Sequence, residues 1–274
     1  MRRLRTAAVI PFLLAISCAS EEPHKPLPNA DEVVKKVIAR EALEDKRIEE
    51  KPRYLFAQRS IEEKLDKGGA VTEHNERLLQ ATLVEGKIYM KLVEKNGQPL
   101  AGDDAKKEAE RERKFRERLK NPKPKKKDDD DDVSLNEELV SRYQFHVIGR
   151  EMVNDREALV LTFLPKTNVK LPEKRRMDKV LNRLEGKVWV DAEAYALLKV
   201  DMHLTEPTSL AGGLGSVRTL DFMIELFQFE PDTFVPKEVR VAFEGRKLFS
   251  SMYVKQTATY SGYRKIETSV AKKD

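Results

Sequence analysis

The chain from residue 186 onward alternates between apolar and polar side chains, and this period of two constrains the fold more than any other feature. Leu220, Phe222 and Ile224 alternate with Asp221 and Glu225, so one face of a strand would be apolar and the other face would be exposed to solvent. The same pattern recurs in residues 186–191, 198–204, 239–243 and 248–260. Five such segments with short links predict an antiparallel sheet whose buried face is covered by helices.

The first part of the chain predicts a helix and three more strands. Asn29 or Asp31 can cap a helix whose apolar residues form one stripe: Val33, Val34, Val37 and Ile38. Residues 54–65, 71–83 and 87–94 read as antiparallel strands, with turn residues between them.

The middle of the chain predicts a hairpin followed by a short helix. Tyr143, Phe145 and Val147 alternate with polar residues, and the chain returns over residues 158–164. Pro172 then opens a helix with four apolar residues on one side: Met177, Val180, Leu181 and Leu184. Residues 244–247 read as a tight turn near the end of the sheet.

Residues 103–132 interrupt the pattern. They hold twelve Lys or Arg and eleven Asp or Glu, with Leu119 as the one large aliphatic residue. Such a composition cannot form a core, so we expect a solvated helix over residues 105–120 and disorder toward the C-terminal end. The aspartates at 128–132 lack the turn glycine of a calcium loop and follow three lysines, which favours a solvated charge run.

The N-terminus has the pattern of an export signal. Arg2, Arg3 and Arg5 precede an apolar run over residues 7–16, which is shorter than the about 20 residues that span a bilayer. The stretch that ends at Cys18, the single cysteine, resembles a bacterial lipobox, whose cysteine is lipidated. The resemblance implies a lipid-anchored protein of the cell envelope, and Ala19 favours the outer membrane. Plain secretion after an ordinary signal-peptidase cut is the alternative.

These features divide the chain as follows: a signal peptide at 1–17, a tether at 18–28, one domain formed by 29–100 and 133–270, and a charged insertion at 101–132. Removal of residues 1–17 lowers the net charge from +5 to +2, so no electrostatic argument for nucleic acid remains. A single cysteine excludes an internal disulfide and a thiolate metal cage.

Sequence motifs of catalysis are missing. The four histidines (His24, His74, His146 and His203) have no paired-ligand spacing, and the chain has no nucleophile elbow and no P-loop. The glycines at 212, 213 and 215 lack the Lys-Ser/Thr of a phosphate loop and read as a flexible loop. We therefore expect no catalytic residue, no metal and no cofactor, although residues that folding brings together leave a hydrolase as a third hypothesis.

The C-terminal strands also resemble a known family. Gly186-Lys-Val-Trp-Val-Asp, followed by Leu198-Lys-Val, is similar to a strand pair of outer-membrane lipoprotein-sorting proteins, and Phe234-Val-Pro-Lys and Tyr260-Ser-Gly-Tyr-Arg are similar to their later strands. The family is the periplasmic lipoprotein-carrier superfamily (LolA/LolB-like). The resemblance implies an α+β fold: a curved antiparallel sheet, or half-barrel, covered on its concave side by helices.

An apolar sheet under a helical lid can leave a cavity. The first hypothesis is therefore an envelope protein that binds acyl chains or a lipidated partner without covalent chemistry. Its cavity would be lined by Leu198, Val200, Met202, Leu220, Phe222, Ile224, Val239, Val241 and Phe243. The alternative is a structural or sensory envelope module with a filled core that binds another protein. A cavity in the structure would favour the first hypothesis, and a packed interior would favour the second.

Overall fold

The computed structural model describes residues 25–50, 54–121, 135–173, 175, 177–210, 215–247 and 250–266. Cys18, the run of aspartates at 128–132 and the glycines at 212 and 213 lie outside the described residues.

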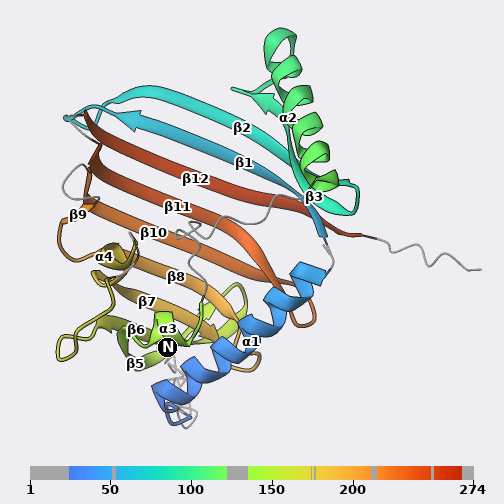
Figure 1. Cartoon of the computed structure of the whole chain (residues 1–274). Coiled ribbons are helices and arrows are strands. Elements are labelled where there is room, and N and C mark those ends of the chain that lie inside the picture. The colour runs from blue at the N-terminus through green and yellow to red at the C-terminus, as the bar shows by residue number, and fades with distance from the viewer. Residues whose placement is uncertain are drawn as a thin grey trace, which may run out of the picture.

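The strands form one open, strongly bent antiparallel sheet (Figure 1). Its order is β4-β3-β2-β1-β12-β11-β10-β8-β7-β6-β5, and β9 pairs with β10 beside this path. The strands are β1 Tyr54–Leu65, β2 Val71–Val84, β3 Lys87–Lys95, β4 Gln98–Pro99, β5 Tyr143–Val153, β6 Arg156–Pro165, β7 Leu184–Asp191, β8 Leu197–Leu204, β9 Thr208–Leu210, β10 Gly215–Glu230, β11 Thr233–Lys247 and β12 Ser250–Lys265.

The structure describes four helices: α1 Ala30–Glu50, α2 Gly102–Lys120, α3 Glu137–Val140 and α4 Asp178–Leu181. The long helix α1 crosses the concave face, and α3 and α4 lie near the other end of the same strands (Figure 1). The predicted class, a curved antiparallel sheet with helices on its concave side, is confirmed.

The α1 helix begins as its sequence predicts. The side-chain oxygen of Asn29 accepts hydrogen bonds from the backbone N–H groups of Asp31 (2.8 Å) and Glu32 (3.3 Å), so Asn29 is the cap. Val33 and Val37 are buried against the sheet, as the apolar stripe predicts.

Two local predictions are wrong. The helix after Pro172 is a single turn, α4, and Leu184 already belongs to β7 because the chain leaves the helix at Asn182. Residues 244–247 do not turn, since β11 continues through them in register with β10 and β12. Gly245 lets β11 pass close to its neighbour there, because an added Cβ would lie 2.6 Å from the carbonyl oxygen of Ser216.

One row of residues across the concave face changes from apolar to polar along the sheet. Residues directly opposite one another on neighbouring strands share a face. One such row crosses ten strands, from β5 to β3: Val147, Leu161, Val188, Val200, Ile224, Val239, Ala258, Ser60, Arg77 and Lys95. The part of the row on β5–β11 is apolar and the part on β1–β3 is polar, so the character of this row changes where β12 meets β1.

Candidate functional site

An apolar cavity of about 260 Å³ lies between the concave face and the helices. Its floor comes from strands β6, β7, β8 and β10: Leu161, Val188, Val190, Leu197, Val200, Met202 and Phe222. Its roof comes from α1, from α4 and from the segment around α3: Val34, Val37, Ile38, Leu135, Leu139, Val140 and Leu181. Its remaining walls are Tyr143, Phe145, Phe163 and Leu184.

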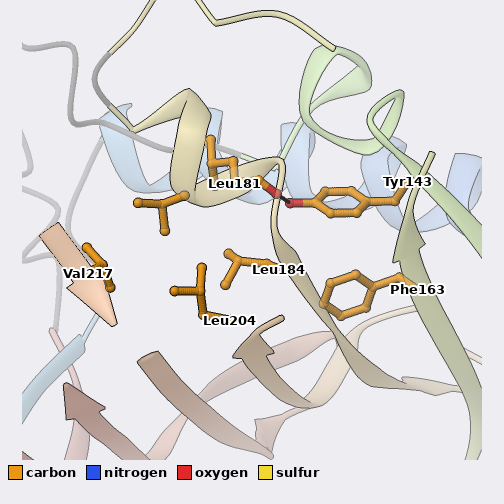
Figure 2. Close-up of a cluster of buried hydrophobic side chains, with 7 residues drawn as sticks. Tyr143, Phe163, Leu181, Leu184, Leu204 and Val217 are labelled. Carbon is orange, nitrogen blue, oxygen red and sulfur yellow. Dashed lines mark hydrogen bonds between the residues drawn. The ribbon is translucent and has the colours of Figure 1, made fainter. Parts of the chain in front are cut away.

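Two packed clusters bound this cavity. The first joins β5 and β6 to α4 and includes Tyr143, Phe163 and Leu184, with Leu204 and Val217 packed beside them (Figure 2). The second lies under α1 and joins Val33 and Val37 to the sheet residues Leu159, Leu161 and Val190. The cavity is the space that these two clusters leave between them.

Of the described side chains that line the cavity, Tyr143 alone carries an oxygen or nitrogen atom. Its hydroxyl donates a hydrogen bond of 2.5 Å to the carbonyl oxygen of Leu181 at the end of α4 (Figure 2). Burial raises the pKa of Tyr143 to about 12, so the group stays neutral. Because this hydroxyl proton is already donated, the cavity offers a guest apolar contact and little else.

Three of the nine residues predicted to line a cavity are at its surface: Val200, Met202 and Phe222. Leu220 and Phe243 pack against the first cluster instead. Ile224, Val239 and Val241 are half-buried on the same face, beside the cavity and in register with Val200 and Phe222. They extend the apolar floor beyond the cavity rather than lining it.

Leu198 lies elsewhere because of a β-bulge in β8. Trp189 pairs with Lys199 and Val190 with Leu197, so Leu198 is an extra residue that shifts the alternation. It is fully buried in a separate cluster with Ala158, Val160 and Trp189. Leu197 takes its place in the cavity, a substitution that strict alternation cannot predict.

The other residues that line the cavity belong to segments that the sequence predicts separately, and no sequence pattern shows that these segments come together. The apolar stripe of α1 and the alternation from Tyr143 to Val147 are both visible in the sequence. Nothing in either pattern shows that they meet across one cavity, since more than a hundred residues separate them.

A buried ion cluster holds α3 and α4 together over one end of the cavity. The side chains of Arg142 and Asp178 are 0% and 1% exposed, and their Nη2 and Oδ1 atoms lie 2.8 Å apart. Arg142 also donates to Glu138 (3.0 Å) and Asn182 (2.6 Å), and Arg175 donates to Glu138 (2.6 Å). This cluster positions Leu139 and Leu181 above the cavity.

The pKa of the Asp178 carboxyl lies below its ordinary value. Burial alone raises this pKa, but the backbone N–H of Arg175 and the charges of Arg142 and Arg175 outweigh burial. Asp178 is therefore a buried carboxylate whose negative charge is stabilised by its partners.

The far edge of the sheet is built from polar contacts. Glu108 of α2 is buried and accepts hydrogen bonds from the Tyr89 hydroxyl (2.7 Å) and from the backbone N–H of Leu92 (3.2 Å). Arg111 pairs with Glu108 and donates to the carbonyl oxygen of Met90 (2.5 Å). The predicted helix of the insertion is thus present, yet it is not wholly solvated, because it supplies hydrogen bonds to the outer edge of β3.

No metal site is found within the part of the chain that the structure describes. His74 lies 3.4 Å from Glu63 and His203 lies 3.1 Å from Glu185, in both cases on exposed strands.

None of the described helices is both long and apolar enough to cross a membrane.

No family model matches the chain, and no curated protein matches it. Solved structures are similar to it at low identity. A putative outer membrane lipoprotein-sorting protein domain from Vibrio parahaemolyticus is 14% identical, with 89% of this chain and 96% of that chain covered and a TM-score of 0.37. A LolA superfamily protein from Nitrosomonas europaea is 10% identical, with 88% and 95% covered and a TM-score of 0.31. A chain of the MucA/MucB complex from Pseudomonas aeruginosa is 13% identical, with 86% and 100% covered and a TM-score of 0.25.

Proteins of the superfamily that the C-terminal motifs resemble are thus among the structures to which this chain is similar. At this identity and TM-score the likeness says nothing about a ligand.

Proposed function

We propose that this protein binds one alkyl chain, the acyl chain of a lipid or of a lipidated partner, in the cavity under α1, α3 and α4. The observation that carries the proposal is a cavity of about 260 Å³ whose described lining is apolar apart from one hydroxyl that is already hydrogen-bonded. For comparison, an apolar protein cavity of roughly 150 Å³ stays dry and binds benzene.

The chemistry of the walls favours an alkyl chain. Each methylene group removed from water contributes about 0.8 kcal/mol, and it needs no polar partner. A polar guest would lose its hydrogen bonds to water without replacement, which disfavours its binding. The lining also supplies no free nucleophile, so the proposal is binding without covalent chemistry.

The half-buried apolar residues beside the cavity support the same proposal. Ile224, Val239 and Val241 continue the floor toward Ala258, and polar residues begin at Ser60 and Gln256 on the next strands. A chain that leaves the cavity across β11 reaches water beside the exposed Gln256, where the polar group of the ligand can remain hydrated. A filled core, the basis of the alternative envelope module, has no such space.

The mutation that tests the proposal places a charge in the cavity. Phe222→Glu should lower the affinity for a fluorescent fatty acid by about a hundredfold or more, because an unpaired buried carboxylate costs several kcal/mol. Thr219→Glu adds the same charge at an exposed position of the same strand and should bind as the wild type does. Wild-type protein that purifies without lipid and ignores the probe would contradict the proposal.

We further propose that the mature protein begins at Cys18 and is held at the periplasmic face of the outer membrane by acyl chains. The support is the export pattern and the lipobox-like stretch of the sequence. Cells that express the protein should incorporate a palmitate analogue into it, and Cys18→Ser should abolish labelling. Equal labelling of both proteins would contradict the anchor and leave the cavity proposal intact.

A further inference from the structure

Phe145 on β5 lies between the apolar cavity and a second hollow. It lines the cavity, and it also contributes to a surface groove of about 280 Å³ beside the start of α1. Residues 28–31, His146 and Val147 line the rest of that groove. Phe145 is therefore the residue that the cavity and the groove share, and it forms the partition between them.

The partition is held firmly. The Phe145 ring centroid lies 6.3 Å from that of Tyr143 and 6.2 Å from that of Phe163, and the Tyr143 and Phe163 centroids are 5.2 Å apart in an edge-on arrangement. The hydrogen bond from the Tyr143 hydroxyl to Leu181 ties this aromatic group to α4. Phe145 also packs against both clusters that bound the cavity.

A row of paired residues leads across the floor to this partition: Phe222, Met202, Gly186, Phe163 and Phe145. Gly186 has no side chain, so the middle of the row is open. No side chain would fit there, because an added Cβ would lie 2.1 Å from the carbonyl oxygen of Asp201. Neighbouring strands are about 4.8 Å apart, so the path from Phe222 to Phe145 spans at most roughly 19 Å. An alkyl chain that enters over Phe222 meets aromatic rings at its far end.

We infer that Phe145 is a specificity-determining residue that closes the far end of the cavity and sets the greatest length of alkyl chain the protein accepts. The inference rests on the proposed function, because it concerns the same cavity. Chains shorter than the limit leave part of the cavity empty, and chains beyond it must expose methylene groups or bend.

The test measures the affinity of the full-length protein for straight-chain fatty acids of increasing length, by competition with a fluorescent fatty acid. Wild-type affinity should rise by up to about fourfold for each added methylene, which is about 0.8 kcal/mol, and then stop rising at the limit. Phe145→Ala opens the cavity into the surface groove, so affinity should continue to rise for longer chains. Phe145→Trp enlarges the partition and should move the limit to shorter chains.

Val217→Ala is the matched control, since Val217 is buried in the first cluster but does not line the cavity. It should reduce stability without moving the limit. If Phe145→Ala and Phe145→Trp bind fatty acids with the wild-type limit, the inference is overturned and the proposed function stands. If the wild-type protein binds no fatty acid, both are overturned. Circular dichroism of each variant shows that a change in the limit belongs to a folded protein.

Discussion

The two ends of the sheet differ in the polarity of one row of residues that crosses the concave face. On β6–β8 the shared row is Leu161, Val188 and Val200, and helices cover it. On β1–β3 the same row is Ser60, Arg77 and Lys95, and water can solvate its charges. An apolar surface must be covered to remain in water, whereas a polar one need not be.

The helices at the two ends are held accordingly. The α1 helix buries Val33 and Val37 and adds polar contacts at its border, as when Arg40 donates to the carbonyl oxygen of Asp232 (2.6 Å). The α2 helix instead uses Glu108 and Arg111 to satisfy backbone groups on the outer edge of β3. This contact protects an edge strand, which would otherwise be a template for pairing with another chain. The helices at the apolar end therefore enclose a cavity, whereas α2 at the polar end satisfies backbone groups at the edge of the sheet.

The largest effect is expected at the ion cluster of the apolar end. Asp178→Ala leaves the Arg142 charge buried without its closest charged partner and should lower the free energy of unfolding by about 3–5 kcal/mol. The change is measured by urea unfolding that is followed by the fluorescence of Trp189. On α2, Asp103→Ala removes a pair whose side chains are more than 80% exposed, together with a charge in the first turn of the helix, and should cost about 1 kcal/mol or less. Equal effects at the two sites would remove the distinction between the two ends.

An intermediate effect is expected at the polar end. Glu108→Ala removes the acceptor of the Tyr89 hydroxyl and of the Leu92 N–H, and should cost about 1–3 kcal/mol. It should also free α2 from β3, so that the variant self-associates through the exposed strand edge. Light scattering measures that association. Glu108→Gln keeps an acceptor at this site and should remain closer to the wild type; association of the wild type to the same degree would contradict the role of α2.

The smallest effect is a dependence of stability on pH that separates the two ends. The lowered pKa of Asp178 means that its carboxylate stabilises the fold above the unfolded pKa, and this stability is lost as the pH falls through the folded pKa, below about pH 4. Asp178→Asn should flatten that part of the curve of unfolding free energy against pH.

The matched variant for this measurement is Glu110→Gln on α2. Arg113 lowers the pKa of Glu110 to about 2, but the Glu110 side chain is 42% exposed and water screens its pair. The wild-type curve should therefore be retained. The prediction would be contradicted if Glu110→Gln flattened the curve of unfolding free energy against pH and Asp178→Asn left this curve unchanged.

Much of the fold could be predicted from the sequence because the relevant signals are local. Alternation predicts β7, β8, β10, β11 and β12 as well as the hairpin of β5 and β6, and Asn29 with its apolar stripe predicts α1. These patterns depend on residues a few positions apart, so the chain need not be folded for them to be visible. The prediction of a longer helix after Pro172 was wrong because it also relied on a local pattern. The apolar residues of that pattern are shared between α4 and the start of β7.

Tertiary structure decided what the local patterns cannot contain. The bulge in β8 moved Leu198 away from the cavity and brought Leu197 into it. The pairing of β1 with β12 joined a polar strand to an apolar sheet, and so placed the border between the two surfaces. The sequence by itself determined which segments have an apolar face. Which faces meet, and what space they leave, depends on contacts between residues far apart in the chain, and these exist only once strand order and register are set.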